Sequence, residues 1–254
     1  MRIAAISDVH GNLPALEAVL ADIDAAGVDL TVNLGDLLSG PLWVAETADR
    51  LMSLELPTIA GNHERQMLTL PPARMGASDA FAVTQLDERR RAWLAWLPTS
   101  LRLSDEVACC HGTPASDLVC FLETVAAHGV RAATLEEATE RAGDTLRGVA
   151  HAVILCGHTH VPRVVRLADG RLVVNPGSVG LQAYAADHPH PHVVENGSPH
   201  ARYALLARED AGWRIELRSV PYDSSAAAEL AGQRGRPDWA DALRTGFMGR
   251  RAAP

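Results

Sequence analysis

The first 60 residues alternate between short apolar segments and segments with helical spacing, and this alternation constrains the fold more than any other feature. Arg2–Ile6, Leu30–Leu34 and Thr58–Ala60 are the expected strands. The helix after the first strand can begin at Asn12, a good cap residue, and end at Gly27. The order strand, helix, strand, helix, strand implies a parallel sheet and an α/β fold.

The second half of the chain favours antiparallel pairing. Residues 101–110, 163–174 and 203–220 each have the pattern of a hairpin, and the second of them turns through an Asp-Gly pair. These hairpins indicate another sheet packed against the first. We therefore expect a single domain over residues 1–254, since this length suits one large α/β domain.

Two further stretches are expected to be helical. One ends before Pro98, which cannot continue a helix. The other covers 121–149 and is mostly helical, with a break near Gly129, so that residues 112–150 could form a helical cap over the cleft. The candidate anchors of the first of these helices are Leu86, Trp93 and Trp96.

Five of the expected strands end in residue types that bind metal ions. In open α/β sheets, ligand sites lie outside the carboxyl ends of the strands. Each residue alone could be a turn former or a solvated histidine, but five such loops together favour a metal site. The candidate ligands are Asp8, His10, Asp36, Asn62, His111, His158 and His160.

The last pair of histidines follows an apolar run, Ala152–Leu155, that Gly157 interrupts. Alternate side chains of an extended segment share a face, so His158 and His160 can converge on one place. Imidazole is the commonest metal ligand near neutral pH. The alternative for this pair alone is a polar turn with two solvated histidines.

Seven candidate ligands are too many for one tetrahedral zinc ion but enough for two ions that share a carboxylate. Paired ions about 3.5–4 Å apart can clamp the attacking and leaving oxygens of a displacement at phosphorus. His63 stays uncommitted beside the cluster and could protonate the leaving alkoxide. With N and O ligands and no thiolate, Mn, Fe or Zn would fit, and we favour Mn.

Composition excludes several kinds of chemistry. The chain has a net charge of −8 and contains no lysine, all 23 basic residues being arginine. A lysine nucleophile, a Schiff base and a P-loop are therefore excluded. The acidic charge argues against duplex nucleic acid as a partner, whereas metal ions could still supply positive charge for a small phosphate-ester substrate.

The four cysteines show no C-x-x-C spacing, and disulfides are not expected. The sequence has no signal-peptide core, and no run approaches the roughly 18 apolar residues of a membrane helix. We expect a cytoplasmic protein that does not act in a membrane. The sequence does not specify its oligomeric state.

Five short motifs contain the polar residues at the strand ends: Asp8-Val9-His10, Gly35-Asp36, Gly61-Asn62-His63-Glu64, His111-Gly112 and Gly157-His158-Thr159-His160. Their order and composition resemble the motifs of the calcineurin-like metallophosphoesterases. The similarity continues through 175–180, as in the compact bacterial members. The resemblance implies a two-sheet β sandwich flanked by helices, in four layers ordered αββα.

The resemblance also implies a mechanism, in which a metal-bridging hydroxide attacks phosphorus and His63 assists the leaving group. Compact bacterial members commonly hydrolyse phosphodiesters, so a metal-dependent phosphodiesterase is expected. The implied ligands are Asp8, His10 and His160 for one ion and Asn62, His111 and His158 for the other, with Asp36 bridging.

The sequence departs from the protein-phosphatase branch of the family after Asp36. That branch continues with a second Asp and an Arg (GDxxDR), which support the catalytic histidine and grip phosphate. Here the run is Gly35–Pro41, without either residue, which argues against a phosphoprotein substrate and leaves the support of His63 unassigned. A phosphomonoesterase and a single-strand nuclease remain alternatives. A non-catalytic scaffold fits less well, because such scaffolds typically lack the histidines that are present here.

Residues outside the motifs give no definite substrate-binding site. The stretch 175–180 is either a tight turn or a source of backbone N–H groups for phosphate. Arg65 and Arg163 could grip phosphate, but we favour a salt bridge for each. His188, His190 and His192 alternate with prolines and are expected in a solvated loop near the mouth of the site.

Overall fold

The side chains of strand β1 (Arg2–Ile6) alternate between two cores, and this alternation explains the layers of the protein. In the computed structural model, which describes residues 1–249, Ile3 and Ala5 lie in a core between two sheets. Ala4 and Ile6 point the other way and pack against helices. A strand buried on both faces has no polar face for solvent, so the sheet is covered on both sides.

The first sheet has the strand order β13-β12-β1-β2. β1 is parallel to β2 (Leu30–Asn33) and antiparallel to β12 (Ala201–Glu209), which forms a hairpin with β13 (Gly212–Val220). The second sheet has the order β3-β4-β7-β9-β8, with parallel inner strands and antiparallel edges. Its strands are β3 (Ser100–Arg102), β4 (Val107–Cys110), β7 (Val153–Leu155), β8 (Arg163–Arg166) and β9 (Leu172–Asn175).

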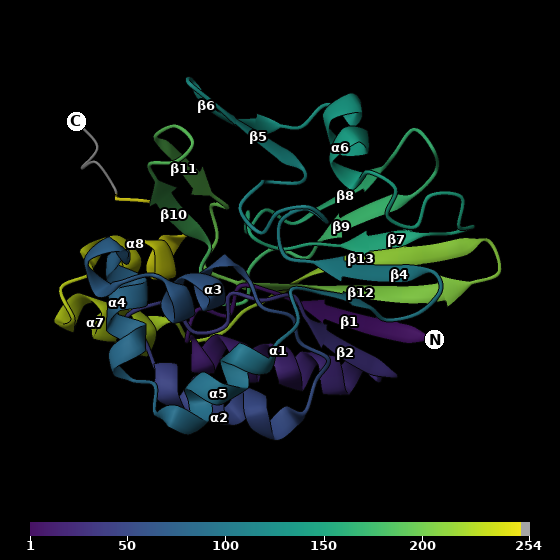
Figure 1. Ribbon diagram of the computed structural model, residues 1–254. Coiled ribbons are helices and arrows are strands. Elements are labelled where there is room, and N and C mark those ends of the chain that lie inside the picture. Colours follow the sequence, from purple (N-terminus) through teal and green to yellow (C-terminus); the bar gives the residue numbers. More distant parts are fainter. Residues whose placement is uncertain (250–254) are drawn as a thin grey trace.

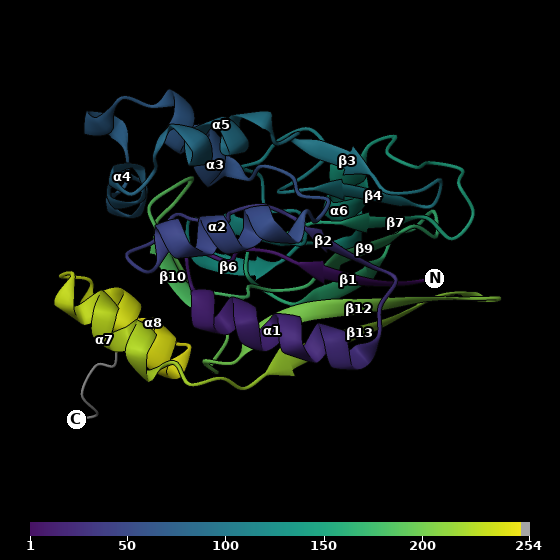
Figure 2. The same cartoon turned by 90° about the horizontal axis from the view of Figure 1, so that it is seen from below.

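Helices cover the outer faces of both sheets (Figures 1 and 2). α1 (Leu13–Ala26), α2 (Val44–Leu54) and α5 (Glu88–Trp96) pack on the first sheet. α6 (Leu135–Ala142) packs on the second sheet, against the outward side chain of Ile154. The order helix, sheet, sheet, helix confirms the expected fold class.

The first helix shows how local sequence sets these boundaries. The side chain of Asn12 accepts a hydrogen bond from the N–H of Ala15, and a proline lies in the first turn. Gly27 ends the helix in a left-handed conformation with φ 64°. Its N–H donates to the carbonyls of Ile23 and Asp24, as a C-cap glycine does.

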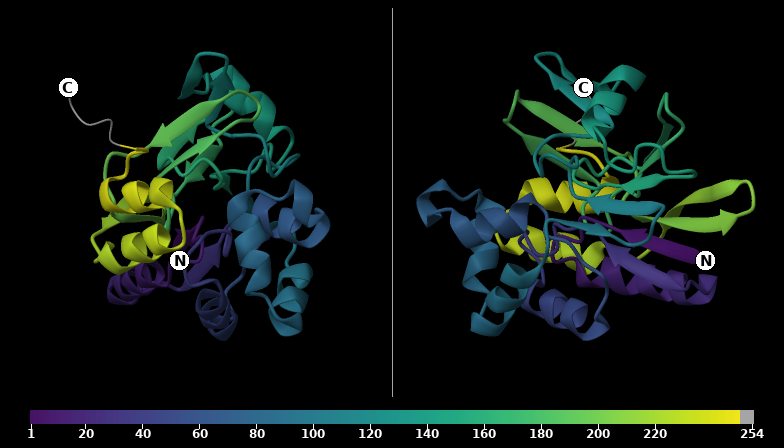
Figure 3. Two further views of the ribbon diagram at one scale, coloured as in Figure 1. Left: turned by 90° about the vertical axis from the view of Figure 1, so that its left-hand side faces the viewer. Right: turned by 45° about the vertical axis from the view of Figure 1, so that its right-hand side comes forward.

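The remaining elements gather at the end of the sandwich where β1 and β2 finish (Figures 1 and 3). The C-terminal helices, yellow in Figure 3, lie on one side of this end of the sandwich, and the blue helices that follow β2 lie on the other side. These elements are α3 (Asn62–Thr69), a 3-10 turn (Pro72–Arg74), α4 (Ala77–Thr84), α7 (Ser225–Gln233), α8 (Pro237–Thr245), and the hairpins β5–β6 (Glu123–Ala126, Gly129–Ala132) and β10–β11 (Ala183–Ala186, His192–Glu195).

The expected helix over 121–149 is wrong in its first half. Residues 123–132 form the β5–β6 hairpin, whose strand residues Thr124, Val125 and Val130 are β-branched. Only α6 and the turns after it remain of the predicted helical cap at 112–150. Gly129, with φ 115°, provides the turn that a helix could not contain.

Several smaller expectations are also corrected. The third strand is reduced to one parallel bridge between Thr58 and Asn33. The hairpin β12–β13 extends the first sheet instead of joining the second. Trp96, expected as an anchor, is 87% exposed. His188 and His190 are exposed in the turn of the β10–β11 hairpin, as expected for a solvated loop, whereas His192 is buried in β11.

Two further observations concern the whole described chain. Cys109, Cys110, Cys120 and Cys156 are all free, as expected. Among residues 1–249, no helix combines the length and the apolar character that crossing a bilayer requires.

Truncation of Leu206 should destabilise the protein, because its side chain is fully buried between the two sheets. We expect Leu206→Ala to lower the free energy of unfolding by about 2–5 kcal/mol, through lost burial and a residual cavity. Leu217→Ala, on the neighbouring strand but 40% exposed, is the control and should change it by less than about 1 kcal/mol. Urea denaturation measures both values, and equal losses would contradict a core between the sheets.

Candidate metal centre

The backbone is strained where the strands of the sandwich end. Asp8, His10 and Asp36 have φ values of 56°, 52° and 56°. His158 and His160, after β7, have values of 70° and 60°. A left-handed backbone at non-glycine residues is of order 1–3 kcal/mol unfavourable and persists mainly at functional sites. These five candidate ligands are thus held in place by their surroundings.

The first group of possible ligand atoms comes from Asp8, His10 and His160, which lie within 4.8 Å of one another. The two imidazole Nε2 atoms are 3.1 Å apart, and His160 Nε2 is 3.4 Å from Asp8 Oδ1. Each ring donates its Nδ1–H to a carbonyl at 2.7 Å, His10 to Ser39 and His160 to Leu181. This fixes the tautomer and turns both Nε2 lone pairs inward, as in metal sites.

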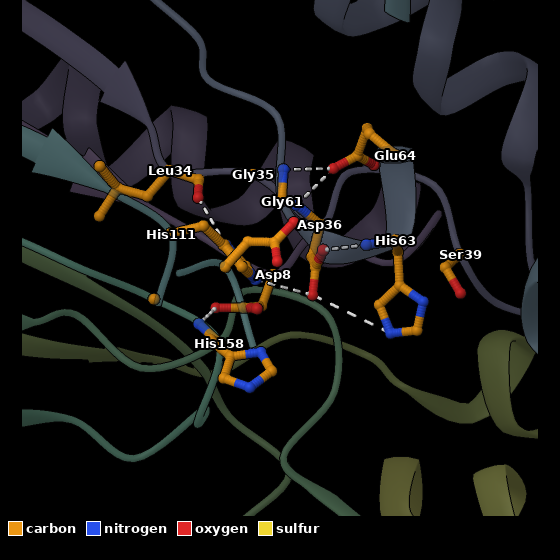
Figure 4. A network of polar contacts seen from close by, with 12 residues as sticks. Asp8, Leu34, Gly35, Asp36, Ser39, Gly61, His63, Glu64, His111 and His158 are labelled. Atoms are coloured by element: carbon orange, nitrogen blue, oxygen red, sulfur yellow. Dashed lines mark hydrogen bonds and ion pairs between the residues drawn. The ribbon is translucent and has the colours of Figure 1, made fainter. Parts of the chain in front are cut away.

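The second group comes from Asp36, His111 and His158, again within 4.8 Å of one another. His111 donates Nδ1–H to the carbonyl of Leu34 at 2.7 Å, and its Nε2 lies 3.0 Å from Asp36 Oδ2 (Figure 4). The backbone N–H of His158 donates to Asp8 Oδ2 at 3.2 Å, which joins the two groups.

Among the candidate ligands, three buried atoms have no hydrogen-bond partner, namely Asp8 Oδ1, Asn62 Oδ1 and His111 Nε2, and the same holds for the neighbouring hydroxyl groups of Ser7 and Ser39. Asn62 is the first residue of α3. Buried polar atoms normally have partners, so orphaned ones indicate a missing ion or water. The mixed N and O donors suit a divalent transition metal. The residues present therefore fit two ions.

Glu64 holds the loops that carry Asp36 and Asn62. Its carboxylate is fully buried and accepts from the N–H groups of Asp36 at 2.8 Å, Leu37 at 2.9 Å and Gly61 at 2.9 Å (Figure 4). A Cβ on Gly61 would lie 2.2 Å from Asp36 Oδ1, so only glycine permits this approach. Glu64 belongs to the motif Gly61-Asn62-His63-Glu64, but nothing in the sequence indicated this supporting role.

His63 faces the cluster from α3. Its backbone N–H donates to Asp36 Oδ1 at 3.0 Å, and its ring Nε2 lies 4.0 Å from Asp36 Oδ2 (Figure 4). Ring Nδ1 lies 2.7 Å from Oδ1 of Asp79, on α4. Burial opposes protonation, but the charges of Asp36 and Asp79 raise the pKa of His63 to about 9. No sequence motif pointed to Asp79.

The pKa values of the other buried histidines are raised or lowered according to the charges of their neighbours. Burial, and then the charge of His160, lowers the pKa of His10 to about 4. Burial, and then the charge of His111, lowers the pKa of His158 to about 4. For His111 burial acts in the same sense, but the charge and the hydrogen bond of Asp36, together with the charge of Asp8, outweigh it and raise the pKa to about 10.

The arginines next to the motifs are both ion-paired, as favoured from the sequence. Arg65 Nε lies 2.6 Å from Oδ2 of Asp117, and Arg163 Nε lies 2.8 Å from Oε1 of Glu123. Both pairs lie outside the two ligand groups.

The stretch 175–180 supports the site from behind. The N–H groups of Val179 and Gly180 donate to the carbonyls of Ser7 and Asp8 at 2.9 and 3.0 Å. These donors are therefore used within the protein, which favours the turn over the phosphate pocket. On the other side, the ring of Tyr184 lies 4.8 Å from that of His160 and brings the β10–β11 hairpin to the site.

A four-layer sandwich that gathers Asp, Asn and His side chains beyond its strand ends is the architecture of a metallophosphoesterase. The model of the calcineurin-like phosphoesterase superfamily domain matches residues 1–195. The chain belongs to this superfamily.

Known proteins resemble the chain over nearly its full length. A metallophosphoesterase from Sphaerobacter thermophilus is 26% identical with a TM-score of 0.72, over 97% of this chain and 100% of that one. The hypothetical protein PH1004 from Pyrococcus horikoshii has the same TM-score at 18% identity, over 98% and 99%. The uncharacterized protein MJ0912 from Methanocaldococcus jannaschii is 24% identical over 93% of this chain and 94% of its own.

Replacement of Asp36 should reduce metal binding, because this carboxylate faces the second group and lies beside the first. We expect about two divalent ions per chain after loading with Mn and removal of free metal. Asp36→Asn should lower the content by at least one ion, since a neutral amide is a weaker ligand. Inductively coupled plasma mass spectrometry measures it, and Asp105→Asn, on an exposed turn, is the control. Equal metal content in both variants would contradict the dinuclear site.

Metal affinity should rise with pH. His111, with its pKa raised to about 10, carries a proton at neutral pH in the metal-free protein, and this proton must leave before Nε2 can bind an ion. His10 and His158 are already neutral there. We expect affinity for the second ion to increase about tenfold per pH unit between about pH 6 and 8. Calorimetry in buffers of different ionisation enthalpy counts the released protons, and none released would refute the prediction.

Proposed function

We propose that the protein is a phosphodiesterase that uses two divalent ions. The observation that carries this proposal is the pair of ligand groups, which the hydrogen bond from His158 N–H to Asp8 Oδ2 joins, with the ring of His63 facing Asp36 of the second group. When bound, the two ions would supply the positive charge that draws in the phosphate and the activation of the attacking water.

The residues of the chain divide the remaining work. The ligand side chains place the phosphorus close to His63, whose Nε2 points into the site and whose Nδ1 is held by Asp79. Water attacks phosphorus and releases a proton to solvent, the bond to the leaving oxygen breaks, and Nε2–H of His63 gives its proton to that oxygen and takes another from solvent. In the metal-free protein the pKa of His63 is raised to about 9, so that the ring carries this proton at neutral pH.

A diester suits the charges around the site better than a monoester does. A monoester dianion carries one more negative charge and benefits from an arginine clamp. Arg65 and Arg163 are each paired with a carboxylate, and the position of the family's phosphate-gripping arginine is occupied by Gly40. The monoanion of a diester needs no such clamp.

His63→Ala should slow the cleavage of diesters according to their leaving group. With an alkoxide leaving group, kcat should fall by about 10²–10⁴-fold, since the general acid is lost. With p-nitrophenolate, a stable anion, the loss should be much smaller. Steady-state assays with Mn on bis-p-nitrophenyl phosphate and on dinucleotides measure both, and equal losses would argue against a general acid at this position.

The same assays separate the alternatives. Faster cleavage of p-nitrophenyl phosphate than of the diester would favour a phosphomonoesterase, and cleavage confined to short single strands would favour a nuclease. A panel of cyclic nucleotides, dinucleotides and oligonucleotides narrows the substrate class. Metal-loaded protein that cleaves none of them would favour a binding scaffold.

A further inference from the structure

The carboxylate of Asp79 meets the ring of His63 on the side turned away from the ligand groups. Nδ1 and Oδ1 are 2.7 Å apart, and the Asp79 side chain is 4% exposed. A carboxylate only accepts hydrogen bonds, so Nδ1 of His63 carries a hydrogen. The ring is thereby oriented with Nε2 toward Asp36.

Asp79 compensates for a residue that the chain lacks. In the GDxxDR run of the protein-phosphatase branch, a second Asp supports the catalytic histidine, and here Ser39 and Gly40 occupy the last two positions. The carbonyl of Ser39 accepts from His10 instead. A Cβ on Gly40 would lie 2.7 Å from the ring of Trp239, so α8 fills this space.

The first turn of α4, which carries Asp79, is held in place by contacts with the C-terminal helical segment. Arg236 donates from Nη1 to Oγ of Ser78 at 2.9 Å. The guanidinium of Arg234 lies over the ring of Phe81, 4.8 Å from its centroid. Residues on both sides of Asp79 are therefore held by the segment between α7 and α8, and α4 has little freedom to carry the carboxylate away.

We propose that Asp79 is the positioning residue of His63, an inference that rests on the proposed function. During cleavage, Nε2 of His63 gives its proton to the leaving oxygen while the bond between phosphorus and that oxygen breaks. Asp79 keeps its hydrogen bond to Nδ1–H throughout and takes no proton. It orients the ring and stabilises the imidazolium before transfer, as an orienting carboxylate does in other acid–base pairs.

Asp79→Asn and Asp79→Ala test this role across aryl and alkyl diesters of increasing leaving-group basicity. We expect kcat to fall by about tenfold or more for the poorest leaving groups, up to the 10²–10⁴-fold loss that removal of the general acid itself causes, and little for p-nitrophenolate. Adding Asp79→Asn to His63→Ala should cause no further loss, since the two residues act as one unit. Metal content should remain at the wild-type value, and Asp105→Asn is the control.

Heteronuclear NMR of the histidine ring nitrogens gives a readout that is independent of activity. In the metal-free protein, a protected Nδ1–H signal of His63 should be present and should disappear in Asp79→Ala. A signal unchanged by that substitution would overturn the proposal, as would an equal loss of kcat for every leaving group. If the wild type cleaves no diester, the proposed function fails, whereas the NMR comparison still decides whether Asp79 holds the ring.

Discussion

Two imidazole nitrogens whose lone pairs face each other are the constraint on which the site depends. His10 and His160 each give their ring hydrogen to a backbone carbonyl, so the Nε2 atoms, 3.1 Å apart, meet without a hydrogen between them. Such a pair is repulsive unless a cation or a proton lies between its members. His111 Nε2 lies 3.0 Å from Asp36 Oδ2, and there the raised pKa of His111 keeps a proton between the two atoms in the metal-free protein. The two-sheet core supplies the stability that tolerates this repulsion and the strained backbone around it.

A second set of interactions, buried hydrogen bonds from side chains, holds the loops of the site in place. Glu64 ties the loop after β2 to the start of α3 through three backbone N–H groups. Ser178 donates to the carbonyl of Asp8 at 2.8 Å, and Asn175 donates to the carbonyl of Gly157 at 2.7 Å. Loops from both sheets are thus cross-linked by buried side chains, which become costly to move because each would lose its partners.

The sequence predicted the parts of the site that are local. Asp8 and His160 come shortly after the apolar runs 2–6 and 152–155, so their position near a strand end followed from the pattern alone. Asp79 could not be found in this way, because it reaches His63 only through the packing of α4. The same limit explains Trp96, whose helical spacing indicated burial although no neighbouring element covers it among the described residues.

The layers were predictable because side chains on both faces of strands such as β1 and β7 are apolar. A sheet made of such strands must be covered on both sides, which leaves few other arrangements of sheets and helices. Regions with weak periodicity were not. Residues 121–132 have the composition of either a helix or a hairpin, and the choice depends on Gly129 and on pairing between strands. The helices α7 and α8 were not assigned from the sequence. α7 is alanine-rich and carries little hydrophobic contrast, whereas the spacing of the buried Trp239 and Leu243 was a signal from which α8 could have been predicted.

The ring of Trp239 on α8 lies 6.0 Å from that of His10 and edge-on to it, and it occupies the space beside Gly40. This helix lies outside the 195 residues that define the superfamily domain. A fragment cut at that boundary would keep every residue of both ligand groups yet lose a wall of the site. Within this protein, the shared domain and the C-terminal helices therefore form one structural unit. Exchanging those helices between relatives would change the shape of the site without altering any candidate metal ligand.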